Sequence, residues 1–195
     1  MIRVESLVGP ERSQALPALA ELRIRVFREW PYLYEGSLEY EQRYLEKFSA
    51  AEDSLIVVAR DGAVIVGAST ASPLVGHADA FAAPFEQRGM DRDRIFYFGE
   101  SVLLPAYRGS GIGHAFFDHR EQHARSLGTF DWLTFCAVVR PEEDERMPDD
   151  YRTLDGFWRK RGFEKMEGLT TDFSWKEPGS SHEVSHVMQF WGKRL

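Results

Sequence analysis

The feature that most constrains the fold is a strand that runs into a helix through a glycine-rich turn. Residues 95–104 (IFYFGESVLL) are apolar enough for a buried strand, and Pro105 has no N–H to give to a sheet, so it marks the strand's end. The turn that follows, 105–113, reads PAYRGSGIG. Apolar residues at helical spacing then predict a helix over 111–127 that ends at Gly128 in a left-handed conformation. Such a junction predicts an α/β chain.

Periodicity on both sides of this junction predicts the other elements. We expect strands over 2–8, 54–60, 63–72, 131–139, 169–176 and 184–191, and helices over 13–30, 37–49 and 151–161. Ser13 is the predicted N-cap of the first helix, and Asp61 with Gly62 predicts a hairpin turn. Residues 73–94 are expected to form a long connection with room for one short helix, and 141–150 an acidic loop.

Length and composition indicate one soluble globular domain over 1–195. The sequence has no internal repeat and no linker, and its 14 Phe, 7 Tyr and 5 Trp supply the apolar area that a core needs. A single cysteine, Cys136, excludes an internal disulfide framework and a cysteine-cluster zinc site. We expect this cysteine to be a small buried apolar residue rather than a nucleophile.

Charge and hydropathy exclude two classes of partner. A net charge of −7 argues against a nucleic-acid binder, which usually carries a basic face. The start of the chain, MIRVESLVGPERSQ, lacks the apolar core of a signal peptide, and no apolar run approaches the roughly 18 residues of a membrane span. We therefore expect a cytoplasmic protein that binds neither nucleic acid nor membrane.

The glycine-rich turn predicts a phosphate site, because the first amides of a helix have no intrahelical partner and carry the positive end of its dipole. Two common phosphate motifs do not match. A Walker A loop needs Lys and then Ser or Thr after its last glycine, but His114 and Ala115 follow Gly113. The dinucleotide fingerprint needs glycine at position 114.

A third pattern, Arg/Gln-x-x-Gly-x-Gly/Ala, matches in full through Arg108, Gly111 and Gly113. It resembles the acetyl-CoA pyrophosphate loop of the GNAT N-acetyltransferase superfamily. The wider phrase LLPAYRGSGIG and the later FWRKRGF (157–163) are similar to that family too, and the likeness covers 54–176, more loosely the whole chain. It implies one mixed, mostly antiparallel sheet flanked by helices, whose parallel fourth and fifth strands splay apart at the centre.

The resemblance also implies how acetyl-CoA is held as co-substrate. Backbone groups of Ser101, Val102 and Leu103 on the fourth strand would meet the pantetheine arm and the acetyl carbonyl. The pyrophosphate would bind the amides of the turn, namely those of Gly109, Ser110, Gly111, Ile112, Gly113 and His114. Arg108 would add a positive charge near the phosphates.

The implied reaction is direct transfer of acetyl to an amine in a ternary complex. The N–H of Leu103 would stabilise the oxyanion. Glu100 is the candidate base, although it could instead pair with an arginine or cap a loop amide. The tyrosine that often serves as acid in the family is replaced here by Trp158, whose indole cannot donate a proton at neutral pH. Tyr151 is the remaining candidate acid, with a water molecule as the alternative.

The acceptor would be an amine of a small molecule or a peptide. Residues 30–36 (WPYLYEG) join the first two helices, where the family builds part of its acceptor pocket, so Tyr32, Tyr34 and Glu35 are candidate substrate residues. His119 and His123 share a helix face, but Glu121 is at the wrong offset for a zinc motif, so no metal is predicted.

Two other functions stay open from the sequence. One is a non-catalytic acetyl-CoA-binding module that regulates a partner, and the other is a phosphate-binding domain for a nucleotide. The last two strands could also pair across a homodimer.

Overall fold

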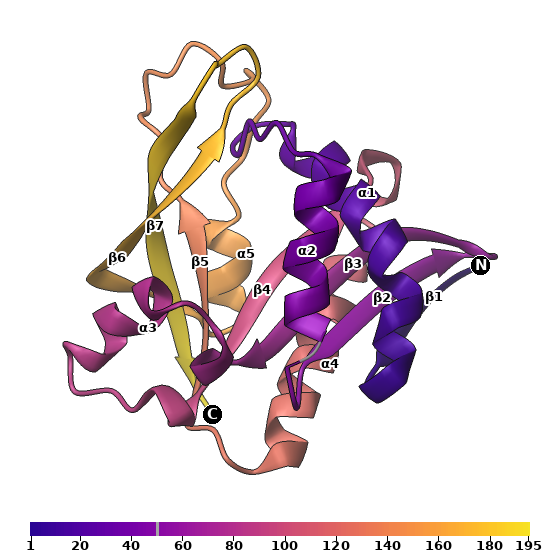
Figure 1. Cartoon of the computed structure of the whole chain (residues 1–195), viewed down its shortest axis with the longest axis vertical. Coiled ribbons are helices and arrows are strands. Elements are labelled where there is room, and N and C mark those ends of the chain that lie inside the picture. The colour runs from indigo at the N-terminus through magenta and orange to yellow at the C-terminus, as the bar shows by residue number, and fades with distance from the viewer. Residues whose placement is uncertain (50) are drawn as a thin grey trace.

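The computed structural model describes residues 1–49 and 51–195, and its strands form one seven-stranded sheet in the order β1-β2-β3-β4-β5-β7-β6. The strands are β1 (Ile2–Leu7), β2 (Leu55–Asp61), β3 (Val64–Pro73), β4 (Ile95–Leu103), β5 (Trp132–Val138), β6 (Glu164–Lys176) and β7 (Glu183–Arg194). The helices are α1 (Leu16–Phe27), α2 (Leu38–Ser49), α3 (Asp79–Glu86), α4 (Ile112–Leu127) and α5 (Asp155–Lys160). This is the mixed α/β architecture that the sequence predicts (Figure 1).

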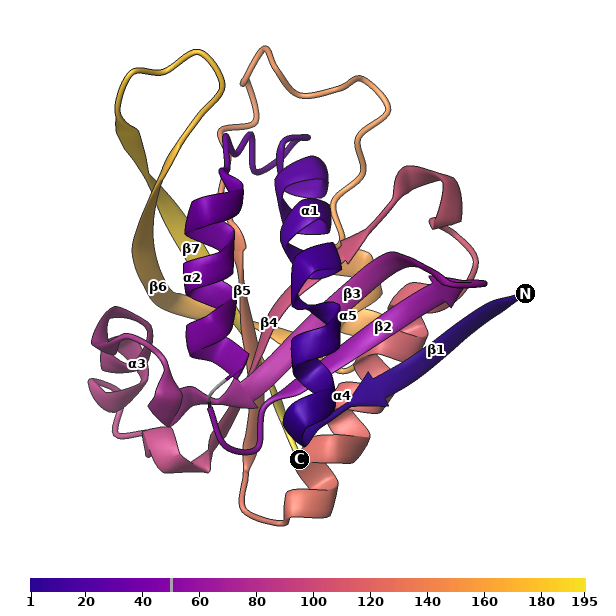
Figure 2. The same cartoon turned by 45° about the vertical axis from the view of Figure 1, so that its right-hand side comes forward.

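Helices cover both faces of the sheet. Figures 1 and 2 show α1 and α2 side by side across one face, with α4 and α5 behind the other. Alternation along β2 explains this, because successive side chains of a strand point to opposite faces. Ile56 and Val58 pack with α1 and α2, whereas Leu55 and Val57 pack with Ile112 and other residues of α4. Among the described residues, no helix combines the length and apolarity that crossing a membrane requires.

The centre of the sheet is a parallel pair that separates, as predicted. β4 and β5 are paired only over Ile95–Tyr97 and Trp132–Thr134. Beyond these residues β4 stays paired with β3, and β5 with β7, so the two strands diverge (Figure 1). The divergence opens a gap in the middle of the sheet, with one unpaired strand edge on each side.

A β-bulge lies on β4 where the gap begins. Phe98 pairs with Ala71 and Ser101 pairs with Ser69, so two residues of β4, Gly99 and Glu100, stand opposite one residue of β3. An extra residue reverses the alternation of faces beyond it. Glu100 therefore points to the face of α1 and α2, although Phe98, two residues earlier, packs on the opposite face.

The first helix departs from its predicted range. Residues Gly9–Ala15 form a 3₁₀ helix, and Ala15, not Ser13, is the N-cap of α1. The reason is Pro17, which an α-helix tolerates only in its first turn, so a helix that contains it cannot begin several residues earlier. The predicted cap at Ser13 is wrong: its hydroxyl donates to the carbonyl of Pro10 at 2.7 Å.

Of the later elements, α5 and the two final strands differ in extent from the prediction, while the connection 73–94 agrees with it. The helix expected over 151–161 is shorter, because Tyr151 closes a turn onto Pro148 and α5 begins only at Asp155. The long connection 73–94 does contain one short helix, α3. The final strands reach further than expected, since β6 begins at Glu164, directly after the buried Phe163.

Candidate active site

The glycine-rich turn places free amides at the start of α4. Gly111 is the N-cap with φ +86°, a left-handed conformation that favours glycine. The amide of Ala115 donates to the carbonyl of Gly111 at 3.1 Å, which opens the helix ladder. The amides of Ile112, Gly113 and His114 lie before that first bond and have no intrahelical acceptor. They form a cluster of donors that suits an anion.

Arg108 ties this turn to two neighbouring elements. Its Nη2 lies 3.0 Å from a carboxylate oxygen of Glu29, just beyond α1, and its Nε donates to the carbonyl of Leu103 at 3.3 Å. Arg108 and Glu29 are both about half exposed, so the pair is weak. A phosphate at the turn would compete with Glu29 for this guanidinium.

The edge of β4 that faces the gap carries the backbone groups of Ser101 and Leu103. The amide of Leu104 donates to the carbonyl of Val66 on β3 at 3.0 Å. Backbone groups of successive residues in a strand point to opposite edges, so those of Val102 also face β3. Of the three residues predicted to meet a pantetheine arm, Ser101 and Leu103 thus present hydrogen-bonding groups to the gap.

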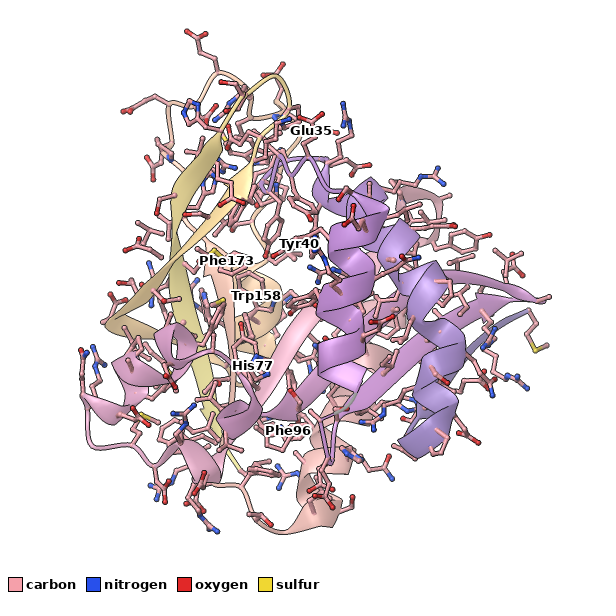
Figure 3. The ribbon with its side chains drawn as sticks, in the orientation of Figure 1. Glu35, Tyr40, His77, Phe96, Trp158 and Phe173 are labelled. Carbon is pink, nitrogen blue, oxygen red and sulfur yellow. The ribbon has the colours of Figure 1, made fainter. Side chains whose placement is uncertain are left out.

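A cavity of about 630 Å³ lies on the α1–α2 face of the sheet. Its walls come from α1, α2 and the loop that joins them, from the segment between β3 and α3, and from β4–β7. Aromatic side chains dominate it: Phe27, Tyr32, Tyr34, Tyr40, Tyr44, Phe48, Phe81, Tyr97, Phe173 and Trp175. The three predicted substrate residues, Tyr32, Tyr34 and Glu35, all line it. In the view of Figure 3, Tyr40 and Phe173 are at a similar height, with Glu35 above them and His77 below.

Glu100 lies in the wall of this cavity in an ion pair. Its Oε2 is 2.6 Å from Nη1 of Arg23 on α1, while Oε1 is buried and has no hydrogen-bond partner among the described residues. Arg23 also contacts Glu41 of α2, whose other oxygen accepts from the hydroxyl of Tyr34 at 2.7 Å. Burial alone would lower the pKa of Arg23, but the carboxylates of Glu100 and Glu41 raise it, so the guanidinium stays charged.

The two candidate positions for the acid lie outside the cavity. Trp158 packs in the core on the α4–α5 side, against Phe135 at 5.0 Å and Trp191 at 5.1 Å between ring centroids. Tyr151 lies in the loop before α5, with its ring edge-on to Trp30 at 6.1 Å. Burial raises the pKa of Tyr151. The structure therefore does not bring Tyr151 together with Glu100.

Cys136 lies in the cavity wall and is hydrogen-bonded to a tyrosine. Its sulfur is 3.0 Å from the hydroxyl of Tyr97, and burial raises the pKa of the thiol to about 12. A thiol with such a pKa remains protonated at neutral pH and is a poor nucleophile. The sequence predicts a small buried apolar residue here, whereas the structure leaves Cys136 half-buried in the cavity wall.

Two histidines of α4, His119 and His123, each have a hydrogen-bond partner. Nδ1 of His119 is 2.7 Å from the hydroxyl of Ser6, and Nε2 of His123 is 3.0 Å from the carbonyl of Asp53. Within residues 1–49 and 51–195, no cluster of three or more metal-ligating side chains occurs.

Sequence reasoning missed several charged or titratable residues of the cavity region, among them Arg23, Glu41 and His77. A signal existed for the first two, because each occupies the apolar stripe of its helix. Arg23 is four residues after Leu19, and Glu41 is four residues before Leu45. His77 lies in the connection after β3, where the sequence carries no periodic pattern.

Comparison with known proteins gives a consistent result. The model of the acetyltransferase (GNAT) family matches residues 18–146. No curated protein matches the sequence. The fold is similar to ribosomal-protein-alanine N-acetyltransferase from Brucella melitensis (TM-score 0.64, 17% identity, 99% of each chain covered). It is also similar to a putative acetyltransferase from Acinetobacter baylyi (TM-score 0.66, 12% identity, covering 100% of this chain and 92% of that one).

A third solved structure bears on the ligand. It is a putative acetyltransferase from Salmonella typhimurium with its cofactor acetyl-CoA (TM-score 0.60, 11% identity, covering 100% of this chain and 94% of that one). At these identities the structures establish the fold.

Proposed function

Because the chain belongs to the GNAT acetyltransferase family, we propose that it transfers the acetyl group of acetyl-CoA to an amine by direct attack in a ternary complex. The observation that carries this proposal is a juxtaposition. The free amides that open α4 lie next to the end of β4, whose unpaired edge runs along the gap toward the cavity with Glu100. An extended ligand with an anionic end fits such a path.

The residues that would hold acetyl-CoA fit its chemistry. The amides of 109–114 would bind the pyrophosphate, and the backbone of Ser101 and Leu103 would pair with the amides of the arm. A side chain added at Gly109 or Gly111 would meet nothing within 4 Å, so the turn is open to a ligand. Acetyl-CoA supplies an activated acyl group: its C–S bond is exchanged for an amide C–N bond, and of the two protons that the ammonium loses, one ends on sulfur and one in water.

The roles of this chain's own groups follow from that exchange. Glu100 would take a proton from the acceptor ammonium, whose free pKa of about 10 keeps it charged at neutral pH. The N–H of Leu103 faces the gap and would donate to the developing oxyanion. Neither Trp158 nor Tyr151 reaches the cavity, so a water molecule is the better candidate for proton delivery to sulfur, in place of Tyr151.

Gly113 offers a sharp test of the pyrophosphate site. It lies in the first turn of α4, and an added Cβ would make only an ordinary 3.7 Å contact with Phe157. Gly113→Asp should fold normally, because a carboxylate in the first turn stabilises a helix by about 0.3–1 kcal/mol. It should nevertheless lose the thermal stabilisation by acetyl-CoA, since its charge repels a diphosphate.

The matched control is Gly113→Asn, which has the same shape without the charge and should keep most of that stabilisation. Equal stabilisation of the two variants by acetyl-CoA, measured over a range of ligand concentrations, would contradict the placement of the pyrophosphate.

One observation favours a second candidate, a non-catalytic acetyl-CoA-binding module. Glu100 is already paired with Arg23, and the family's usual acid position holds Trp158 in the core. Release of free thiol in the presence of a panel of amines separates the two functions. Stabilisation by acetyl-CoA without turnover of any amine favours the module.

A further inference from the structure

We propose that the acceptor is a primary amine on an aromatic or similarly flat apolar body, bound as its ammonium with the nitrogen at the free oxygen of Glu100. This inference rests on the proposed function and specifies its acceptor. It follows from the floor, the charge and the walls of the cavity described above.

The floor of the cavity contains an unpaired acceptor atom. The side chain of Glu100 is only 5% exposed, and its Oε1 has no partner among the described residues. A buried charged oxygen without a hydrogen bond is costly, whereas an N–H donor placed against it forms a strong charge-assisted bond. Because Oε2 is held by Arg23, the orientation of Oε1 is fixed before any ligand binds. The site is thus prepared for a donor.

The charge around this atom favours a cation. Glu41, Arg23 and Glu100 form a chain of two carboxylates around one guanidinium, with a net charge of −1 when all three are ionised. All three side chains are at most 11% exposed, so solvent screens this charge poorly. The buried guanidinium of Arg120, on the opposite face of β4, also attracts Glu100 and offsets part of this charge. An ammonium at Oε1 would still form a charge-assisted pair with the carboxylate, whereas a carboxylate or phosphate there would be repelled at contact distance.

The residues of the cavity wall indicate which kind of group, attached to the ammonium, the cavity would accommodate. The faces of Phe27 and Tyr44 are occupied by Arg23, whose guanidinium carbon lies 5.2 and 4.6 Å from their centroids. Further out, Tyr40 from α2 and Phe173 from β6 line the same cavity from different elements and are 43% and 37% exposed (Figure 3). Exposed aromatic rings in the wall of one cavity bind a flat apolar group well.

Size and polarity agree with a small apolar body. The volume of about 630 Å³ is within the range of small-molecule sites, roughly 300–1,000 Å³. At the entrance the charge of Glu35 is offset by Lys176, whose Nζ is 3.7 Å away. A polyamine would place its other ammonium groups among aromatic rings, where cation–π attraction and Glu183 beside Tyr40 offset only part of their desolvation cost. A peptide would leave its backbone amides there at a desolvation cost.

The first experiment compares acceptors on the whole chain with saturating acetyl-CoA, with free thiol as the readout. The acceptors are 2-phenylethylamine, spermidine and a tetrapeptide with N-terminal alanine. We expect kcat/KM for 2-phenylethylamine to exceed that of the other two by about tenfold or more, the discrimination that an apolar pocket achieves for a modest difference in buried surface.

The second experiment separates the charge from the ring by calorimetric binding. Glu100→Gln should weaken binding of 2-phenylethylamine but leave that of 2-phenylethanol, which has the same ring without the charge, unchanged. Phe173→Ala should weaken both about fivefold, the usual effect of one aromatic contact. The matched control is Leu38→Ala, an exposed apolar residue on α2 outside the cavity wall, which should change neither.

The outcomes distinguish this inference from the function on which it rests. Faster transfer to spermidine or to the peptide overturns the acceptor class and leaves the acetyltransferase standing. Binding that follows the predicted pattern without thiol release from any amine supports the class of ligand but overturns the function. Equal loss of amine and alcohol affinity in Glu100→Gln overturns the role of its free oxygen.

Discussion

At the scale of single residues, the central arrangement is one guanidinium held between two buried carboxylates. Replacing such a group by apolar residues is often neutral for stability, so its value lies in fixing orientation. Arg23 immobilises one oxygen of Glu100 and leaves the other for a ligand. Glu41 and Tyr34 fix Arg23 in turn. The orientation of the proposed base thus depends on α1 and α2 as well as on its own strand.

His77 gives a prediction about pH. Its Nε2 is 2.7 Å from the hydroxyl of Ser72, its ring packs against Phe81 and Tyr97, and burial lowers its pKa to about 4. The unfolded chain therefore binds a proton at His77 more readily than the folded chain between about pH 6.5 and 4, so this residue destabilises the fold as the pH falls through that window.

The effect should reach at most about 3 kcal/mol at pH 4, since each unit of pKa shift corresponds to roughly 1.4 kcal/mol. It is measured as the difference between the wild-type protein and His77→Gln in urea unfolding at pH 7, 5.5 and 4. A difference that stays constant over the three pH values would show that His77 does not titrate in this way.

At the scale of elements, the bulge on β4 decides which face receives Glu100. Without the extra residue, Glu100 would point to the face of Phe98, among the aromatic side chains between the sheet and α4. Arg120 of α4 supports the bulge from that face: it is buried over the rings of Phe98 and Phe117, and its Nη1 donates to the carbonyl of Thr70 at 3.4 Å. Thr70 is the residue of β3 that has no register partner on β4.

The close approach of the two strands at the bulge is testable. A Cβ on Gly99 would lie 2.3 Å from Oγ1 of Thr70, so Gly99→Ala should cost about 1–3 kcal/mol of stability through overpacking. Thr70→Ala removes the obstructing atom and should restore part of that loss in the double variant. Thr70→Val keeps an atom at that position, so it should not restore the lost stability when combined with Gly99→Ala. Chemical denaturation of the wild type, Gly99→Ala and the two double variants checks this. Equal stability of the two double variants would contradict it.

The elements differ in how far the sequence predicts them. The bounds of α4 agree closely with the prediction because glycines mark both ends, Gly111 at the N-cap and Gly128 at φ +68° beyond the C-terminus. The predicted start of α1 is too early, because apolar spacing alone does not show that Pro17 must lie in the first turn. The bulge could not be predicted, since 95–104 is almost uniformly apolar and such a run does not show where the alternation changes.

At the scale of the whole molecule, Arg140 joins three segments that are distant in sequence. Its Nη1 is 2.6 Å from Glu177 beyond β6, while its Nε and Nη2 donate to the carbonyls of Pro31 and Tyr32 at 2.7 Å. Nε1 of Trp175 donates to the same Tyr32 carbonyl at 2.9 Å. Arg140 therefore holds the loop between α1 and α2 against the β6–β7 hairpin, the two sides of the cavity.

Removing this contact should affect the acceptor more than the co-substrate. Arg140→Met leaves Glu177 half-paired and two backbone carbonyls free, which should cost roughly 2–5 kcal/mol of stability. We expect KM for the amine to rise about tenfold, equivalent to 1.4 kcal/mol, with KM for acetyl-CoA unchanged. Arg146→Met is the control, because Arg146 also pairs with Glu177 but is half exposed and does not bond the loop. Equal changes in both KM values would contradict the assignment.

The candidate site was only partly predictable because it is assembled from distant segments. The phosphate-binding turn is local, so Arg108, Gly111 and Gly113 are visible in one stretch of sequence. Tyr32, Tyr34 and Glu35 were placed through the family resemblance. The partnership of Arg23 with Glu100 depends on the bulge and on how α1 crosses the sheet, and no spacing in the sequence encodes either.

The separation of β4 and β5 gives this sheet four borders instead of two. β1 and β6 form the outer borders, and the strand segments 98–103 and 135–138 form the inner ones. Exposed backbone at a strand border is a template for association with another chain, which proteins avoid by covering it. The inner borders lie inside the sheet, whose two faces are covered by helices (Figures 1 and 2), so a slender ligand reaches them more easily than a second polypeptide. The arrangement that admits such a ligand therefore also guards the chain against aggregation.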